Sequence, residues 1–332
     1  MGEAYPNFSN LKRKGDNGVI GVIGGSIEYT GAPYYSAIAS LKSGADLAHV
    51  FCHTDAVIPI KCYTPELIVH PGFDNNENSE LLDRSIRWFK SMSAFVIGPG
   101  LGREDSMKKI FNTILKGTKD LGNLTHLHIL DKYHVMDADS LFHFMNNKED
   151  EVIKDIIKSG NDKFIFTPNV NEFQRLYTAF FEDYDKFNMD EEEQIIKNFN
   201  LEEEIIEIDL KDDNFKYFER EVKLSKVLGN KIIVLKGLND VITNGNLLYI
   251  VGNKGSSKRC GGIGDILGGI IATIVSMKKS SNLDVMKCIA SACFICKYAS
   301  FKAYEKHHYS LTAPNVIEEI SRVLNDLLKD KF

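Results

Sequence analysis

Short apolar runs recur along this chain, and most of them lead into a glycine turn or a segment with helical spacing. The runs with the length of buried strands span residues 18–25, 48–52, 66–70, 94–97, 135–137, 164–166 and 232–235. Helical spacing lies between them, at residues 33–44 and 104–116. Because strands that alternate with helices form βαβ units, the sequence predicts an α/β fold with a mostly parallel central sheet and helices on both faces.

A chain of 332 residues can form one large α/β domain or two ordinary ones. Residues 182–221 interrupt the alternation and are rich in Asp, Glu, Asn, Lys and Phe. We interpret them as an acidic surface insertion, partly helical or disordered, and rank a partner-binding role below a solvated insertion. The prediction is one domain over residues 1–332 that carries this insertion.

Charge and hydropathy exclude several classes of protein. The net charge of −6 and the pI near 5.9 argue against a general nucleic-acid binder. No apolar run reaches the roughly 18 residues that a membrane span needs. Residues 1–15 lack the apolar core of a signal peptide and are not a convincing transit peptide, so we expect a cytoplasmic protein, with a mitochondrial form not excluded.

Six scattered cysteines suit a reducing compartment. Cys293 and Cys296 form a C-x-x-C pair inside an apolar helical pattern, with no second pair elsewhere. We therefore interpret them as core residues rather than as metal ligands or a redox pair.

The segment from Arg259 to Asp265 places three glycines and a carboxylate at the start of an apolar helical pattern. The first N–H groups of a helix lack intrahelical partners and carry partial positive charge, so a glycine-rich start predicts a phosphate site. A carboxylate there would repel phosphate, which suggests that Asp265 takes a proton from an attacking hydroxyl. The alternative is a glycine turn packed for steric reasons, with Asp265 as an N-cap.

Other polar motifs follow predicted strands, at the edge of an open α/β sheet where ligands bind. Three glycines between Gly98 and Gly102 suggest a backbone that approaches a ligand closely. Asp137 and Asp139 could bind a cation or order water, or could cap the next helix.

Two further motifs offer charged and amide groups. The segment from Asn169 to Arg175 combines amides, a carboxylate and a guanidinium; Arg175 could pair with phosphate or with the acidic segment nearby. Lys236 could offset phosphate charge, although a lysine at a surface turn is the commoner explanation.

These motifs, in this order, resemble the eukaryotic ATP-dependent (S)-NAD(P)H-hydrate dehydratase family, which has a ribokinase-like fold. The matching segments are residues 21–52 with EYTGAP, PELIVHPG at 65–72, VIGPGLGR at 96–103, DADSL at 137–141, TPNVNEFQRLY at 167–177, VLKG at 234–237 and KRCGGIGDILGG at 258–269. The resemblance covers nearly the whole chain apart from residues 182–221, which are longer than the family usually carries.

The resemblance implies ATP-dependent repair of hydrated NADH or NADPH, with ATP as co-substrate rather than ADP and with Mg²⁺ as cofactor. It implies small-molecule partners, with no nucleic acid and no membrane. Metal ligands, a homo-oligomer and the preference between the two hydrates are left open.

The resemblance also implies roles for individual residues, with Asp265 as the catalytic base that faces the substrate. The residues that would contact the hydrate are Gly102, Asn169, Val170, Asn171, Glu172, Phe173, Gln174, Arg175 and Asp265. Those that would contact ATP are Lys236, Gly237, Leu238, Asn239, Asp240, Gly255, Ser256, Ser257, Lys258, Arg259, Cys260, Gly261, Gly262, Ile263 and Gly264.

Two other functions fit parts of the pattern. A small-molecule kinase of the same fold, acting on a thiazole or pyridoxal alcohol, would share the glycine loop and the base. The segment 169–175 and the EYTGAP region argue against it. A catalytically silent nucleotide-binding protein would not require Asp265.

Overall fold

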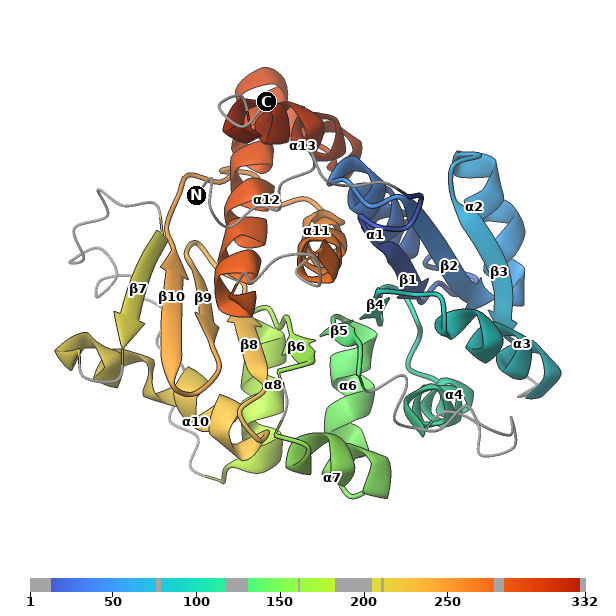
Figure 1. The fold of residues 1–332 in the computed structure, drawn as a ribbon, viewed down its shortest axis with the longest axis horizontal. Helices are drawn as coiled ribbons and strands as arrows, with labels where there is room; N and C mark the ends of the chain where they lie inside the picture. The colour runs from blue at the N-terminus through green and yellow to red at the C-terminus, as the bar shows by residue number, and fades with distance from the viewer. Residues whose placement is uncertain are drawn as a thin grey trace.

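The computed structural model describes residues 13–75, 79–116, 131–160, 162–182, 205–209, 212–277 and 284–328. Within them, the strands form one 10-stranded sheet in the order β3-β2-β1-β4-β5-β6-β8-β9-β10-β7. Helices cover both faces of this sheet (Figure 1). The predicted α/β architecture is therefore confirmed.

Most of the sheet is parallel. The parallel strands are β1 (Val19–Ile23), β2 (Leu47–His53), β3 (Ile68–Phe73), β4 (Ala94–Ile97), β5 (Tyr133–Met136), β6 (Phe164–Phe166) and β8 (Ile232–Leu235). β9 (Asp240–Thr243), β10 (Leu247–Val251) and β7 (Ile205–Asp209) extend it in antiparallel pairs. The central strands are buried on both sides, which explains why they are continuous apolar runs.

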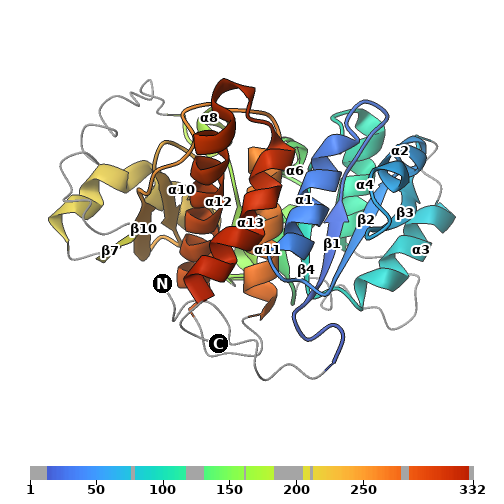
Figure 2. The same cartoon turned by 90° about the horizontal axis from the view of Figure 1, so that it is seen from above.

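Two hydrophobic cores lie on opposite faces of the sheet. The first face carries α1 (Gly31–Lys42), α11 (Ile263–Met277), α12 (Val285–His307) and α13 (Ala313–Leu328), which lie side by side in Figure 2. The second face carries α3 (Ser79–Phe89), α4 (Asp105–Lys116), α6 (Asp139–Asn146), α7 (Glu151–Lys158), α8 (Val170–Phe180) and α10 (Glu219–Val227). The remaining elements are α2 (Val57–Tyr63) and the short 3-10 segments Thr54–Ala56, Asp213–Phe218 and His308–Ser310.

Small residues bring α11 unusually close to α1. A Cβ on Gly269 would lie 2.1 Å from the carbonyl oxygen of Ser36, so only glycine fits there. The hydroxyl of Ser40 donates to the carbonyl of Gly269 at 3.2 Å, and that of Thr273 donates to the same carbonyl at 2.9 Å. This close packing fixes the axis of α11, whose first turn lies at the carboxyl ends of the parallel strands.

The structure corrects two predictions made from the sequence. The strand predicted at residues 66–70 runs from Ile68 to Phe73. The acidic insertion, interpreted from the sequence as partly helical or disordered, also contains a strand: its residues 205–209 form β7, which pairs with β10 along the sheet. Residues 183–204 of the insertion and the N-terminal residues 1–12 lie outside the described part of the chain.

Two predictions from the sequence, the absence of a membrane span and the role of the C-x-x-C pair, can be compared with the described residues. None of their helices combines the length and the apolar character needed to cross a membrane. Cys293 and Cys296 are free thiols buried in the first core, as the core-packing interpretation predicted.

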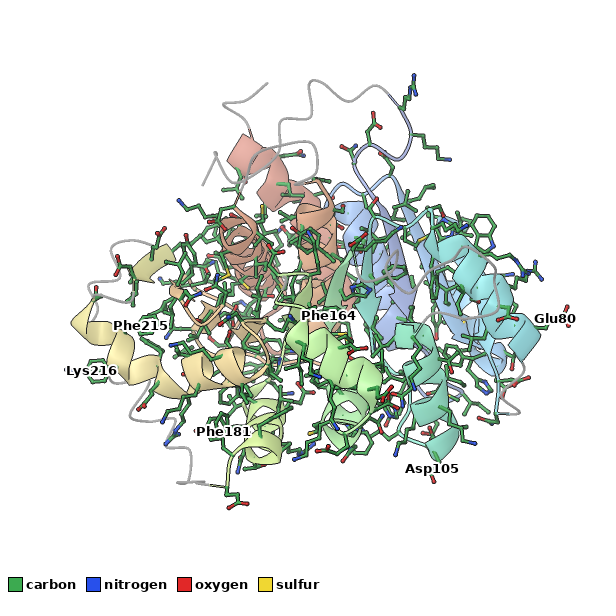
Figure 3. The ribbon with its side chains drawn as sticks, turned by 60° about the horizontal axis from the view of Figure 1, so that its bottom comes forward. Glu80, Asp105, Phe164, Phe181, Phe215 and Lys216 are labelled. Carbon is green, nitrogen blue, oxygen red and sulfur yellow. The ribbon has the colours of Figure 1, made fainter. Side chains whose placement is uncertain are left out.

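Aromatic and histidine rings stack along the second face of the sheet. The ring of His134 lies between those of Phe95 and Phe164, with centroid distances of 5.4 and 4.6 Å. Phe164 lies well inside this face in Figure 3, whereas Glu80 and Asp105 lie at its rim. Burial lowers the pKa of His134 to about 3, because the charged ring would lose its hydration.

A pair of histidines, His49 and His70, lies nearer the edge of the sheet. Their ring nitrogens His49 Nδ1 and His70 Nε2 lie 2.9 Å apart, and one of the two donates a hydrogen bond to the other. Burial is the main cause that lowers the pKa of each to about 4.

We expect acid to destabilise the fold through these rings. Each has a folded-state pKa below its ordinary value of 6.5, so the unfolded chain binds more protons between that pH and about 4. The free energy of unfolding should therefore fall as the pH drops through this window. In urea titrations, His134→Phe should lose less stability over the window than the wild type; equal losses would show that His134 titrates normally in the fold.

Candidate active site

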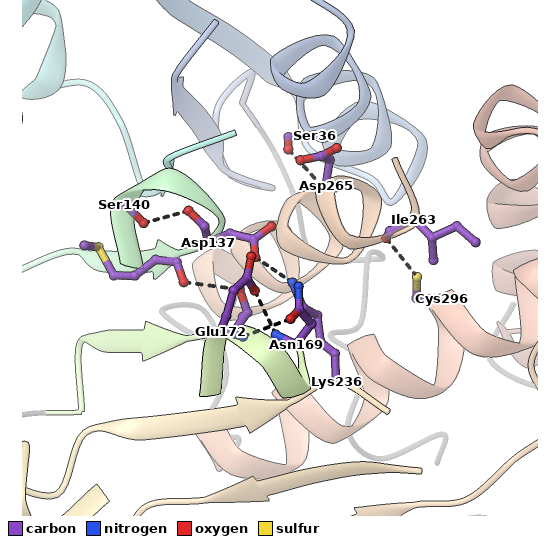
Figure 4. A network of polar contacts seen from close by, with 11 residues as sticks. Ser36, Asp137, Ser140, Asn169, Glu172, Lys236, Ile263, Asp265 and Cys296 are labelled. Atoms are coloured by element: carbon purple, nitrogen blue, oxygen red, sulfur yellow. Dashed lines mark hydrogen bonds and ion pairs between the residues drawn. The ribbon is translucent and has the colours of Figure 1, made fainter. Parts of the chain in front are cut away.

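The carboxyl ends of β5, β6 and β8 meet beneath the first turn of α11. This is the edge of an open α/β sheet at which ligands bind. Figure 4 shows Asp137, Glu172, Lys236 and Asp265 converging there from four different segments. They are separated by up to 128 positions in the sequence, so the fold alone brings them together.

A buried ion pair joins two of these strand ends. Lys236 Nζ donates to Asp137 Oδ1 at 2.6 Å, and the hydroxyl of Thr167 donates to the same oxygen at 2.9 Å. Asp137 is only 2% exposed. Burial acts to lower the pKa of Lys236, but the carboxylates of Asp137 and Glu172 outweigh it, so the pKa is raised and the lysine stays charged.

Asp265 lies in the first turn of α11 and faces this pair. Its backbone carbonyl accepts a hydrogen bond from the hydroxyl of Ser36 at 2.9 Å, which ties it to α1. Burial, and then the Asp137 carboxylate, raise the pKa of Asp265 to about 8, although Lys236 opposes the shift. Because α11 begins at Ile263, Asp265 lies within the helix and the N-cap alternative does not apply.

The glycines of the loop differ in what surrounds them. Gly262 has φ +97°, and a Cβ there would meet the ring of Tyr35 at 2.7 Å and Ala313 at 2.8 Å. Gly261 has open space in the corresponding direction. A Cβ on Gly264 would point toward Lys236 Nζ at 3.3 Å. Packing therefore excludes a side chain at Gly262, whereas Gly264 leaves room beside the Lys236 ammonium and Gly261 borders open space.

The segment from Asn169 to Arg175 is built around a capping box at the start of α8. The side chain of Asn169 accepts from the Glu172 N–H at 3.0 Å, and the side chain of Glu172 accepts from the Asn169 N–H at 2.8 Å. Phe173 is fully buried in the second core, whereas Asn171 and Arg175 are exposed. Val170 and Gln174 are partly buried.

The turn from Lys236 to Asp240 is held from inside. Asp240 is buried, and its side chain accepts from the Gly237 N–H at 3.0 Å. Lys297 Nζ on α12 donates to the carbonyls of Leu238 at 2.7 Å and Gly237 at 3.1 Å. Burial raises the pKa of Asp240, and Lys297 opposes the rise. Asp240 thus shapes the turn, while Leu238 is exposed and Asn239 is partly buried.

The loop before the glycines is tied to the connection between α12 and α13. Lys258 Nζ donates to the carbonyls of Tyr309 at 2.5 Å and Leu311 at 2.9 Å, and the hydroxyl of Ser256 donates to the carbonyl of Lys258. Cys260 is partly buried, and burial raises the pKa of its thiol. In the same loop Ser257 and Arg259 are exposed and Gly255 is partly buried.

The loop after β4 is locked from α6. Asp139 Oδ2 accepts from the Gly102 N–H at 3.0 Å, and Asp139 Oδ1 accepts from Arg103 Nε at 2.7 Å. His143 Nε2 lies 2.8 Å from the Gly102 carbonyl, so this nitrogen carries the proton that it donates. The N-cap of α6 is Ala138 without a side-chain cap, so neither aspartate of the pair caps this helix.

Sequence reasoning missed several residues that shape the site. Ser36, Thr167 and Lys297 all bond to its loops or to Asp265. Lys297 had a visible signal, because it is a lone cation in an apolar helical run. Ser36 and Thr167 had none, because small hydroxyl residues are common in ordinary helices and loops.

A bound divalent cation would find carboxylates here, but no complete protein ligand set. In the described ranges, no group of three or more His, Cys, Asp and Glu side chains is arranged to hold a metal ion. Mg²⁺ that arrives with a nucleotide commonly uses only one or two carboxylates plus water and phosphate. Asp137 and Glu172 fit such a role by their position, because they follow β5 and β6 and lie beneath the first turn of α11 (Figure 4).

Solved structures share this architecture. A ribokinase-like superfamily protein from Enterococcus faecalis aligns with a TM-score of 0.67 at 20% identity, covering 98% of this chain and 95% of that one. An ADP/ATP-dependent NAD(P)H-hydrate dehydratase from Bacillus subtilis, co-crystallised with ATP and Mg²⁺, aligns with a TM-score of 0.63 at 17% identity, covering 98% and 96%. The fold is ribokinase-like.

The sequence comparisons identify the family within this fold. A family model described as NAD(P)H-hydrate dehydratase matches residues 20–322. The chain therefore belongs to the NAD(P)H-hydrate dehydratase family. Relatives named ATP-dependent (S)-NAD(P)H-hydrate dehydratase include one from Ciona intestinalis, 39% identical over 97% of this chain and 78% of its own length. Another, from Homo sapiens, is 33% identical over 98% and 82%.

We expect Asp265→Asn to stabilise the fold, and increasingly so at higher pH. The folded-state pKa near 8 exceeds the ordinary 3.8, so between these values the folded wild type holds a proton that the unfolded chain releases. Its free energy of unfolding therefore falls as the pH rises through that window. Denaturant titrations of both proteins from about pH 5 to 8 should show a widening difference. A constant difference would mean that the Asp265 pKa is not raised.

Proposed function

We propose that this protein catalyses the ATP-dependent dehydration of (S)-NAD(P)H hydrate to NAD(P)H, with release of ADP and phosphate. The observation that carries the proposal is Asp265, a carboxyl with a raised pKa at the glycine-rich start of α11, beside the Lys236–Asp137 pair. Membership of the family and the names of its relatives support the same activity.

The chemistry explains why a dehydratase would need ATP. In the hydrate, water has added across a ring double bond and left a hydroxyl at C6. Hydroxide is a poor leaving group, whereas phosphate is a good one. Transfer of the γ-phosphoryl group to the hydroxyl allows the C6–O bond to break with its electrons on phosphate, assisted by the ring nitrogen. Loss of a proton from the neighbouring C5 then restores the double bond.

The residues of the site match the first step. Asp265 takes the proton of the C6 hydroxyl, and a pKa of about 8 suits a base that must accept and release protons near neutral pH. Lys236 offsets charge on the transferred phosphoryl group. The N–H groups at the start of α11, left open on the side of Gly261, receive phosphate oxygens.

Mg²⁺ belongs to the proposal as the partner of ATP, where it would neutralise charge on the phosphates. Asp137 and Glu172 are the residues that would hold it. All six cysteines are free thiols, which fits a reducing compartment, and we propose the cytoplasm.

An assay of hydrate repair tests the function directly. Purified protein is mixed with (S)-NADH hydrate and with ATP or ADP in parallel, while the absorbance of the reduced ring and the release of phosphate are followed. We expect both signals to rise together, and faster with ATP. Phosphorylation of a thiazole or pyridoxal alcohol, with no recovery of the reduced ring, would instead establish a small-molecule kinase.

We expect Asp265→Asn to reduce turnover by roughly 10² to 10⁴-fold, the range for loss of a general base. ATP binding should change little, because an amide of the same shape keeps the helix start intact. Asp105→Asn is the matched control, since Asp105 also lies in the first turn of a helix but is exposed on α4. Turnover is measured by the repair assay and ATP binding by calorimetry; wild-type turnover in Asp265→Asn would remove Asp265 from the mechanism.

A further inference from the structure

Arg103 carries a guanidinium that is fixed in place although half of its side chain is exposed. Its Nε donates to Asp139 Oδ1 at 2.7 Å, and its Cζ lies 5.0 Å from the centroid of the Phe142 ring. The side chain of Arg103 is 48% exposed, whereas that of Asp139 is 14% exposed. The carboxylate and the ring therefore orient the guanidinium without covering it.

The polar groups of the preceding residue are already occupied. The Gly102 N–H donates to Asp139, its carbonyl accepts from His143, and Gly102 itself is buried. A Cβ on Gly102 would point at the carboxylate of Glu104, 2.4 Å away. The polar groups of Gly102 are thus engaged, whereas Arg103, the next residue, presents a partly exposed guanidinium.

Arg103 also lies within electrostatic reach of the proposed substrate side of the crevice. Its charge acts on Glu172 at the start of α8, where it opposes the rise in the pKa of that carboxyl. Asp139, its partner, acts in turn on Asp265. Arg103 therefore belongs to the same electrostatic neighbourhood as the base, on the loop after β4, whereas the proposed phosphate loop for ATP lies on α11.

We propose that Arg103 is a phosphate-binding residue for the dinucleotide hydrate, and that Asp139 is the positioning residue that aims it. This rests on the proposed function. A guanidinium with Nε engaged still presents N–H donors in a fixed plane, and such a fork suits phosphate oxygens. Every hydrate of this class contains a pyrophosphate, and that is the group we assign to Arg103. NADPH hydrate adds a 2′-phosphate, which is the other source of the same chemistry.

Four variants test the proposal in the repair assay. We expect Arg103→Ala to raise KM for the hydrate about 10 to 100-fold, as for loss of hydrogen bonds to a charged group, with kcat and KM for ATP changed less than about threefold. Arg103→Lys should recover part of the loss, because it keeps the charge but not the fork. Asp139→Asn should raise KM for the hydrate by a smaller factor, since an amide oxygen can still accept from Gly102.

Arg322→Ala is the matched control. Arg322 is also an exposed arginine paired with a buried carboxylate, Glu319, but it lies well along α13. We expect wild-type kinetics from it. Thermal unfolding of all variants checks that each is folded.

The two hydrates distinguish the phosphate sources. Equal losses with NADH hydrate and NADPH hydrate support the pyrophosphate assignment, whereas a loss confined to NADPH hydrate would overturn it in favour of the 2′-phosphate. Unchanged KM for both hydrates, or a rise in KM for ATP alone, would overturn the proposal altogether.

Binding of the products NADH and NADPH, followed by fluorescence of the reduced ring, separates this inference from the proposed function. Both products contain the pyrophosphate, so Arg103→Ala should weaken their binding by about 10-fold or more even in a protein without turnover. If the wild type binds NADH but repairs no hydrate, the proposed function fails and the role of Arg103 is still decided by these affinities.

Discussion

The buried ion pair between Lys236 and Asp137 is the interaction on which the site depends. It joins the ends of β8 and β5, and Thr167 at the end of β6 adds a second hydrogen bond to the same carboxylate oxygen. Two charges removed from water are costly unless each has a close partner, so this pair requires the three strand ends to hold their arrangement. The same two groups act in opposite directions on Asp265, because the carboxylate raises its pKa and the ammonium lowers it. The contact that joins the strand ends therefore also adjusts the pKa of Asp265, which burial raises in the first place.

The other half of the site is positioned by steric fit rather than by charge. Gly269 allows α11 to touch the backbone of α1, and the serine and threonine hydroxyls between the two helices bond to backbone carbonyls. Ser36 continues this contact to the carbonyl of Asp265. The first turn of α11 thus cannot move toward or away from the sheet without breaking the packing of α1. A base held by packing faces a lysine held by an ion pair, and neither group depends on a flexible loop for its place.

Much of this could be predicted from the sequence, for identifiable physical reasons. Buried parallel strands are continuous apolar runs, so the sheet and the polar strand ends were visible, and the glycine start of α11 pointed to Asp265. The roles of Asp137 and Asp139 could not be decided from the sequence, because a carboxylate at a strand end can cap a helix, bind a cation or form an ion pair. Only the fold brings Lys236 to Asp137 and the Gly102 N–H to Asp139. The roles of Gly262 and Asp240 were also inaccessible, because Tyr35, Ala313 and Lys297 approach them from distant parts of the chain. The strand at residues 205–209 was missed because an acidic composition hides its alternation.

That strand gives the acidic insertion a meaning that its composition does not suggest. β7 lies against β10 and, among the described residues, is the last strand of the sheet on that side. An uncovered strand offers its unpaired N–H and carbonyl groups to any other extended chain, which is a common origin of aggregation. Acidic residues such as Glu207 and Asp209 on β7 make it a poor template for a second molecule. The carboxylates of β7 therefore place negative charge along this edge of the described sheet, where a second strand would otherwise pair.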